Sequence, residues 1–274
     1  MSDFSPEASS EAAPPLTVEE AIANLRGPDL SLRYYAAWWL GKFRISDPAV
    51  VDVLIEALED EADRTQLGGY PMRRNAARAL GKLGDRRAVP GLIHCLDCED
   101  FYVREAAAQS LEMLGDTAAV PALMQLLTGG VHAADPVPGR PHLQEPCEAV
   151  MEALGTLQAI EAIPLIQPFL DHPTKRVQYA ATRAMYQLTG DDSYGRPLVE
   201  ALQGTDIVLR RVALSDLGAI GYLPAAEAIA TAPAENSFKL IALKGLLEKQ
   251  VNPANHNTLS EDAIQVMNLM DSLL

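Results

Sequence analysis

The residues with the clearest chemical potential are pairs of side chains one helical turn apart, which recur at one place in successive segments. This spacing puts both members of a pair on the same face of a helix. The pairs are Tyr34 with Trp38, Arg74 with Arg78, Glu105 with Gln109, Glu148 with Glu152, Tyr179 with Arg183, and Arg211 with Ser215. Aromatic rings offer flat walls, guanidinium groups bind carboxylates, and carboxyl groups accept N–H groups or move protons. The sequence therefore predicts a surface for a flat ligand that carries acidic groups, or for a partner protein.

The segments that hold these pairs share a template: an apolar residue and Arg, two variable residues, small residues, and then Leu-Gly. It starts at Leu32, Met72, Val103 and Leu209, and in weaker form at Pro146 and Val177. A second apolar segment with helical spacing follows most copies. No copy buries its apolar face alone, so neighbours must stack. The pattern predicts an all-α, HEAT-like α-solenoid, a superhelix of about six to seven helix pairs.

Within a template copy, we expect a core face and a ladder of charges. In the first copy the expected core positions are Leu32, Ala36, Leu40 and Phe43. Arg33, Arg104 and Arg210 each follow an aspartate by four residues, Asp29, Asp100 and Asp206. We interpret these residues as a structural Asp–Arg ladder and leave the three arginines out of the predicted binding surface.

The chain divides into three parts. Residues 1–15 are rich in Ser, Ala, Glu and Pro and are expected to be a disordered leader. Residues 16–250 form the solenoid, and 251–274 a C-terminal tail or capping helix. Two stretches interrupt the repeat: 129–141, with its Gly and Pro residues, is expected to be neither helix nor strand, and 61–71 is a shorter loop.

Composition restricts the partners. The net charge is −15 and the pI about 4.7, which argues against nucleic acid, whose phosphates reward clustered positive charge. The sequence has no apolar run of about 18 residues and no secretory signal, so we expect neither a membrane span nor export. Three cysteines in such a chain suggest free thiols in a reducing cytoplasm.

Other candidate chemistry is weak. Cys95 and Cys98 form a C-x-x-C without a second pair, and we expect structural packing at a helix end rather than redox or metal chemistry. Cys147 is expected to be inert. His132 and His142 flank the 129–141 loop and are minor acid–base candidates. We predict no metal site and no catalytic triad.

Two strings of residues are far more specific than the template. Arg33-Tyr34-Tyr35-Ala36-Ala37-Trp38-Trp39-Leu40-Gly41-Lys42-Phe43 is one, and Tyr70 to Gly84 (YPMRRNAARALGKLG) is the other. Together they resemble the E (alpha) subunits of E/F-type phycobilin lyases, over about residues 16–250. The resemblance implies a carbon–sulfur lyase that acts as a heterodimer with an F subunit. The pair would attach phycocyanobilin through a thioether to a cysteine of the alpha subunit of phycocyanin, with the bilin as substrate and no further cofactor.

This implied activity suggests roles for the paired residues. Tyr34, Trp38, Arg74, Arg78, Tyr179 and Arg183 would contact the bilin, and Glu148 and Glu152 would be the catalytic acid–base groups. Alternatives stay open: Tyr34 and Trp38 only pack against the N-terminal segment, or the whole chain is a non-catalytic adaptor or chaperone for phycobiliproteins. A lyase-isomerase subunit for phycoerythrocyanin and a protein that removes bilins are further possibilities.

Overall fold

The computed structural model describes residues 16–250 and 259–274, in which every regular element is a helix. The predicted leader and residues 251–258 lie outside the described residues. The α-helices are α1 Val18–Arg26, α2 Leu30–Lys42, α3 Pro48–Glu56, α4 Pro71–Leu83, α5 Val89–Cys95, α6 Phe101–Leu114, α7 Val120–Gln125, α8 Cys147–Thr156, α9 Ile163–Ile166, α10 Lys175–Thr189, α11 Arg196–Ala201, α12 Ile207–Ile220, α13 Ala226–Thr231, α14 Asn236–Gln250 and α15 Glu261–Asp271. The all-α prediction is confirmed.

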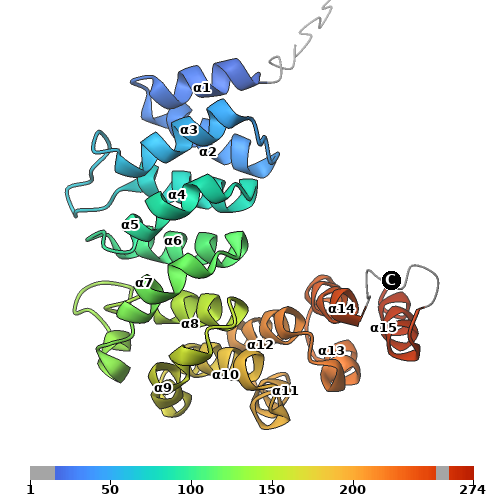
Figure 1. Cartoon of the computed structure of the whole chain (residues 1–274). Coiled ribbons are helices and arrows are strands. Elements are labelled where there is room, and N and C mark those ends of the chain that lie inside the picture. The colour runs from blue at the N-terminus through green and yellow to red at the C-terminus, as the bar shows by residue number, and fades with distance from the viewer. Residues whose placement is uncertain (1–15, 251–258) are drawn as a thin grey trace, which may run out of the picture.

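The helices form a ladder that bends along its length (Figure 1). The even-numbered helices from α2 to α14 contact one another in succession and face the inside of the bend. Helices α9, α11 and α13 lie along its outer side (Figure 1). The helices that carry the paired residues therefore share one continuous inner layer, as expected of a solenoid.

The Leu-Gly step of the template allows the inner helices to approach closely. A Cβ atom added to Gly81 would lie 2.6 Å from Ser110 Oγ and 2.8 Å from Ser110 Cα on the next inner helix. A Cβ on Gly218 would lie 2.9 Å from Ala242 Cα. These distances are below ordinary contact, so glycine at this step sets the spacing between successive repeats.

The arginine of the template joins one repeat to the next. Arg33 Nε donates to the carbonyl of Leu25 (2.9 Å) and its guanidinium pairs with Asp60. Arg210 repeats this geometry, with Nε donating to the carbonyl of Leu202 (3.1 Å) and Nη1 to that of Pro233 (2.7 Å). Both side chains are buried, which agrees with a structural role.

The predicted pairing of the template arginines with the aspartates four residues before them is wrong. Asp29, Asp100 and Asp206 instead cap α2, α6 and α12, where each carboxylate accepts backbone N–H groups of the first turn. A helix N-terminus has free N–H donors that an aspartate at this position satisfies. In the Asp-x-x-x-Arg pattern, the aspartate therefore caps its helix, and the arginine separately connects adjacent repeats.

The core face of the first copy is rotated from the predicted one. Ala36 and Leu40 are buried, but Leu32 is 46% and Phe43 57% exposed. Arg33, which lies one turn before Ala36 and Ala37, is the buried residue at the start of the face. The buried stripe of the helix includes Arg33, which joins the repeats. The apolar residue next to it, Leu32, therefore faces solvent.

The two interruptions of the repeat are ordered and lie next to each other. The prediction that 129–141 is neither helix nor strand is wrong in part, because Gly130–Ala134 forms a 3-10 helix and Pro136 makes an isolated bridge with Leu143. A guanidinium N–H of Arg140 donates to the carbonyl of Leu67 in the 61–71 loop (3.4 Å). Backbone hydrogen bonds close the longer loop on itself, such as those from the N–H of Val137 to the carbonyl of His142 (3.1 Å) and from the N–H of Gln144 to the carbonyl of Asp135 (2.9 Å).

At the C-terminal end, α15 packs against α13 and α14. Ala263 and Val266 are its buried residues, and Ser260 caps its first turn by accepting the N–H of Ala263 (3.1 Å). Helix α15 therefore covers the last helix pair of the ladder.

Candidate functional site

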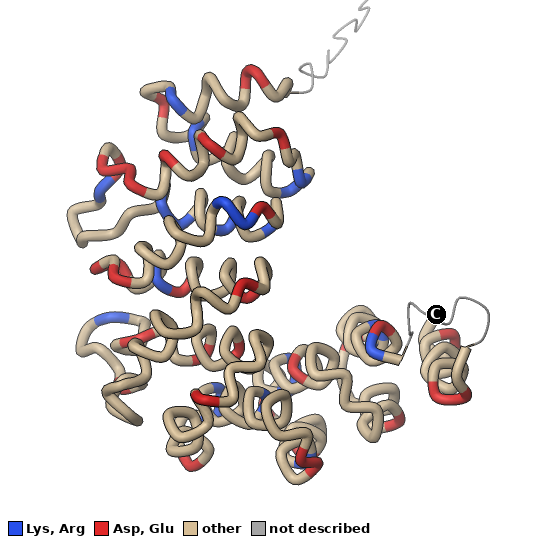
Figure 2. The backbone as a smooth tube through the Cα atoms, viewed as in Figure 1, with Lys and Arg blue, Asp and Glu red and all other residues tan. Residues whose placement is uncertain are grey.

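Helix α4 supplies the basic part of the inner face. It carries Arg73, Arg74, Arg78 and Lys82 without an acidic residue, and Figure 2 shows the resulting run of positive charge. Within the described residues neither Arg74 nor Arg78 forms an ion pair or a hydrogen bond through its side chain. Arg74 lies over the ring of Tyr102, with its guanidinium carbon 5.8 Å from the ring centroid. Both predicted arginines thus retain donors for an anionic ligand.

Helix α6 places Glu105 beside these cations. The carboxyl is half-buried, and burial raises its pKa, an effect that the guanidinium groups of Arg78 and Arg74 oppose. Glu105 has no hydrogen-bond partner for its side chain among the described residues. A carboxyl in this setting can accept an N–H group from a ligand or exchange a proton with it.

Of the two predicted catalytic glutamates, Glu148 lies near Glu105, on the same part of the inner face. Arg176 of α10 pairs with it at 2.7 Å from Nη2 to Oε2. Glu152 lies one turn further along α8 in a different environment, 3.1 Å from Nη1 of Arg183. The structure therefore separates the pair into one ion-paired group near the basic helix and one group in a buried cluster.

The buried cluster joins four successive inner helices. Arg183 of α10 contacts Glu112 at 2.6 Å, Glu152 at 3.1 Å and Asp216 at 3.5 Å. Burial raises the pKa of Glu152 to about 8 and that of Asp216 to about 6, because three carboxyl groups share one guanidinium away from water. Burial therefore favours the protonated form of these two carboxyl groups.

Tyr34 has a structural role. Its hydroxyl donates to Oδ2 of buried Asp63 (2.8 Å), and burial raises the pKa of the phenol to about 12. The same oxygen of Asp63 accepts the backbone N–H of Met72 (2.6 Å) at the start of α4. Trp38, in contrast, is 51% exposed and lies 5.7 Å from the ring of Tyr35. The predicted pair is divided between a structural hydrogen bond and an open surface.

The prediction that Tyr179 and Arg183 lie on an exposed face is wrong. Tyr179 is 9% and Arg183 7% exposed. Tyr179 packs into the C-terminal core and borders, with Tyr194 and Pro197, a separate hollow between α10 and α11. The reason is the position of α10, which contributes to both hydrophobic cores and so has little free surface.

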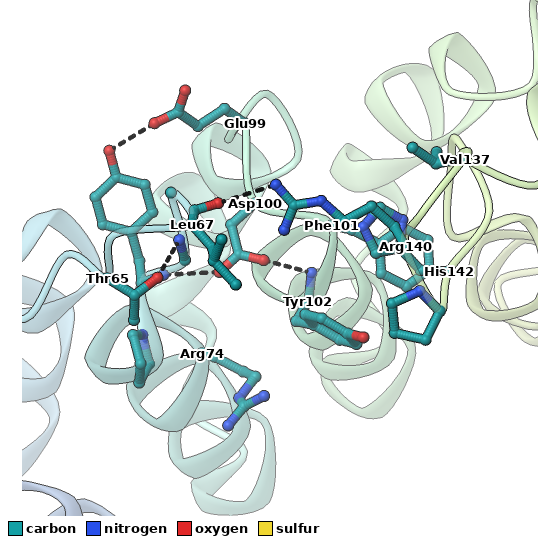
Figure 3. A pocket seen from close by; sticks show the side chains of 15 residues that line it. Thr65, Leu67, Arg74, Glu99, Asp100, Phe101, Tyr102, Val137, Arg140 and His142 are labelled. Atoms are coloured by element: carbon teal, nitrogen blue, oxygen red, sulfur yellow. Dashed lines mark hydrogen bonds between the residues drawn. The ribbon is translucent and has the colours of Figure 1, made fainter.

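The sequence did not reveal a pocket that lies beside the basic helix α4. The 61–71 loop, the N-terminal turns of α4 and α6, and the 129–141 loop enclose a pocket of about 470 Å³ (Figure 3). Its walls include Tyr70, Arg74, Tyr102, Arg140 and His142. The two breaks in the repeat were the available signal, but only the fold shows that they meet.

Aromatic rings form the floor of this pocket. The rings of His142 and Phe101 stack with centroids 4.6 Å apart and planes inclined by 12°, and Tyr102 meets His142 edge-on at 5.7 Å. A hydrogen bond between Nδ1 of His142 and the carbonyl of Leu143 (2.7 Å) fixes the imidazole. His142, a minor candidate by sequence, is thus a built element of the pocket, whereas His132 is exposed and pairs with Asp135 (3.0 Å).

A smaller hollow of about 150 Å³ continues from the pocket toward the inner face. It shares four residues with the pocket, and beyond them reaches Glu105, Glu148 and Arg176. The shared residues are Phe101, Tyr102, Pro141 and His142. We call the two hollows together the rim groove: it runs from Arg140 and Arg74, across the aromatic floor, to Glu105 and Glu148.

Of the three cysteines, Cys147 borders the smaller hollow of the rim groove, as a buried thiol. All three are free thiols, and burial raises the pKa of Cys95 and of Cys147 to about 12. Cys95 ends α5, as structural packing requires. No cluster of metal-binding side chains occurs among the described residues, and none of their helices is long and apolar enough to cross a membrane.

Comparison with known proteins places this geometry in a family. The family model of HEAT repeats matches residues 70–133, and that of the PBS lyase HEAT-like repeat matches 32–60 and 147–172. Phycocyanobilin lyase subunit alpha of Nostoc sp. (strain PCC 7120) is 70% identical over 266 residues, which cover 97% of this chain and 96% of that protein. The corresponding protein of Synechocystis sp. (strain PCC 6803) is 58% identical, covering 95% of this chain and 97% of that protein.

A more distant relative and a solved structure extend the comparison. The bilin biosynthesis protein PecE of Nostoc is 44% identical, covering 96% of this chain and 98% of that protein. A chain in the complex of CpcE and CpcF of phycocyanin lyase from Nostoc sp. PCC7120 superposes with a TM-score of 0.90 and 69% identity, over 99% of this chain and 100% of that one. The resemblance inferred from the two residue strings is confirmed. The chain belongs to the family of phycocyanobilin lyase alpha subunits.

Proposed function

We propose that this chain is one subunit of a heterodimeric lyase that attaches phycocyanobilin to a cysteine of the alpha subunit of phycocyanin. The carrying observation is the near full-length match to a chain of the CpcE–CpcF complex, at 69% identity and a TM-score of 0.90. The partner would be an F-type subunit like the CpcF of that complex. Phycocyanobilin would be the substrate, and no further cofactor is needed.

The proposed reaction is an addition. The acceptor thiol adds to the exocyclic double bond of the bilin: a C–S bond forms, the C=C bond becomes single, and a proton moves to the second carbon. No electrons are gained or lost overall. The nucleophile comes from the acceptor, which agrees with the buried, high-pKa Cys95 and Cys147. The lyase would then accelerate the addition by positioning a flat dianionic substrate and by supplying or accepting one proton.

The residues of the inner face support these two tasks. Arg74 and Arg78 keep free donors for carboxylates. Glu105 and Glu148 lie near them, and we propose Glu148, with Glu105, as the groups that meet the pyrrole N–H groups. Glu152 pairs with Arg183 in the buried cluster, where burial raises the pKa of its carboxyl. The free thiols fit a reducing cytoplasm, where we place the chain.

Co-expression tests this function. The chain, a CpcF-like partner and the alpha subunit of apophycocyanin are produced in bacteria that make phycocyanobilin, and zinc-stained denaturing gels detect bound bilin. We expect a covalent adduct only when both lyase chains are present. An acceptor that is captured without becoming coloured would support the adaptor alternative, and colour lost from holo-phycocyanin would support bilin removal.

A further inference from the structure

The rim groove contains donors that the protein itself does not use. Arg74 Nε is buried without a hydrogen-bond partner, and the side chain forms no ion pair among the described residues. Arg140 is exposed, and within the described residues the one hydrogen bond of its side chain goes to the carbonyl of Leu67 at 3.4 Å. Two guanidinium groups thus reach one pocket from different loops and helices, each able to take a carboxylate in a bidentate pair (Figure 3).

The acidic residues of the pocket do not compete for these donors. Asp100 accepts the backbone N–H groups of Tyr70 (2.7 Å) and Tyr102 (2.9 Å), and so is occupied by the start of α6. Glu99 accepts the hydroxyl of Tyr70 (2.9 Å) and pairs with Arg64. Both carboxylates are held by other groups at the wall, and neither pairs with Arg74 or Arg140 among the described residues.

Between the two ends of the groove lies a surface suited to conjugated rings. His142 and Phe101 stack in parallel, and Tyr102 presents its edge to His142. Side chains from two segments of the chain build this floor, and the imidazole is fixed by its hydrogen bond to Leu143. A planar π-system can extend such a stack by offset contact. The far end offers the half-buried carboxyl of Glu105, which has no hydrogen-bond partner for its side chain among the described residues.

The order of these groups restricts the ligand. A flat molecule with carboxylates at one edge and N–H groups along its conjugated rings satisfies the arginines, the floor and Glu105 together. The main pocket, at about 470 Å³, falls in the range of small-molecule sites.

We propose that the rim groove binds the propionate-bearing part of the bilin, with Arg74 and Arg140 pairing with its carboxylates and the His142–Phe101 stack supporting its rings. This inference rests on the proposed lyase function and names the part of the chain that holds the substrate. It assigns Arg140, His142 and Phe101, which lie in no repeat template, to substrate binding. Tyr34, Tyr179 and Arg183 then have structural roles.

A ligand swap separates direct contact from an indirect effect. Phycocyanobilin and its dimethyl ester, which lacks both negative charges, are titrated into the heterodimer and followed by visible absorbance. The unaltered pair should bind the free acid more tightly than the ester. The double variant Arg74→Gln/Arg140→Gln should bind the acid at least about tenfold more weakly and no longer distinguish acid from ester.

A control variant and two measurements of folding show whether a change in bilin binding is specific to the two arginines. Arg86→Gln removes one exposed charge from the outer 3-10 turn of the same repeat and should leave the preference for the acid unchanged. Far-UV CD and a thermal melt show whether each variant is folded. A folded double variant that still prefers the acid would overturn the inference, as would one that binds bilin normally but no longer binds the acceptor protein. If the unaltered pair binds neither ligand, the proposed function itself fails.

Discussion

Arg104 offers the sharpest test of how the repeats are held together. Its Nε donates to Glu145 (2.9 Å), Nη1 to the carbonyl of Cys98 (2.7 Å) and Nη2 to the carbonyl of Gln144 (2.7 Å). The side chain is 12% exposed, and that of Glu145 is 30% exposed. Arg104 therefore ties the turn before α6 to the end of the loop that carries His142.

The magnitude follows from what Arg104→Met leaves behind. Methionine keeps much of the apolar stem but strands one carboxylate and two carbonyl groups. Breaking a fully buried pair costs about 3–5 kcal/mol, and the partial exposure of Glu145 lets water replace some of the lost contacts. We expect a loss of about 2–4 kcal/mol in the free energy of unfolding. Arg104→Lys should recover less than half of it, because an ammonium cannot hold the three-way fork.

Urea denaturation followed by far-UV CD measures this loss, with Arg26→Met as the matched control. Arg26 pairs with Glu56 at 3.0 Å, but both side chains are more than half exposed, and such pairs contribute about 0–1 kcal/mol. If Arg104→Met and Arg26→Met differ by less than about 0.5 kcal/mol, the clamp does not stabilise the junction. A reduced urea dependence for Arg104→Met alone would show that the repeats on either side unfold separately.

Three further predictions concern the core, the buried charges and the thiols. Gly81→Ala should destabilise the fold by about 1–3 kcal/mol, because its Cβ would meet Ser110 within 2.8 Å, and a loss below about 0.3 kcal/mol would refute the close-packing role. Glu152, whose pKa is raised from 4.5 to about 8, binds more protons in the folded chain than in the unfolded one between these pH values, and Asp216 acts in the same direction up to about 6. Stability should therefore fall as pH rises from about 4.5 to about 8, and Glu152→Gln, which keeps the contacts to Arg183 without the charge, should flatten the fall in a series of thermal melts. An unchanged slope would contradict the assignment. Cys98, the half-buried thiol, should react with a thiol reagent faster than Cys95 and Cys147, and equal rates for all three would contradict their burial.

Sequence periodicity predicts the ladder because each repeat is a local unit. The apolar-Arg to Leu-Gly template reports contacts with the adjacent repeat, and these are the same at Arg33 and Arg210. What periodicity does not encode is the exact face of each helix. Leu32 and Phe43 have apolar side chains, but the buried stripe runs through Arg33, and their exposure follows from that rotation.

The site was harder to predict because it depends on irregular segments. Arg74, Arg78 and Glu148 lie on the inner face, as the one-turn spacing suggested. Tyr179 and Arg183 have the same spacing, but α10 lies where both cores meet, and tertiary packing buries them. The rim groove joins residues 65–71 to 137–142, and no rule of spacing connects loops so far apart in the chain.

A reconstitution from purified proteins tests the central claim most directly. This chain, a CpcF-like subunit, the alpha subunit of apophycocyanin and phycocyanobilin are mixed, and each protein is left out in turn. We expect a bilin that stays bound on denaturation to appear on the acceptor at a rate that requires both lyase chains, with the absorbance of native phycocyanin. Equal attachment at an equal rate without this chain would contradict its role as a lyase subunit.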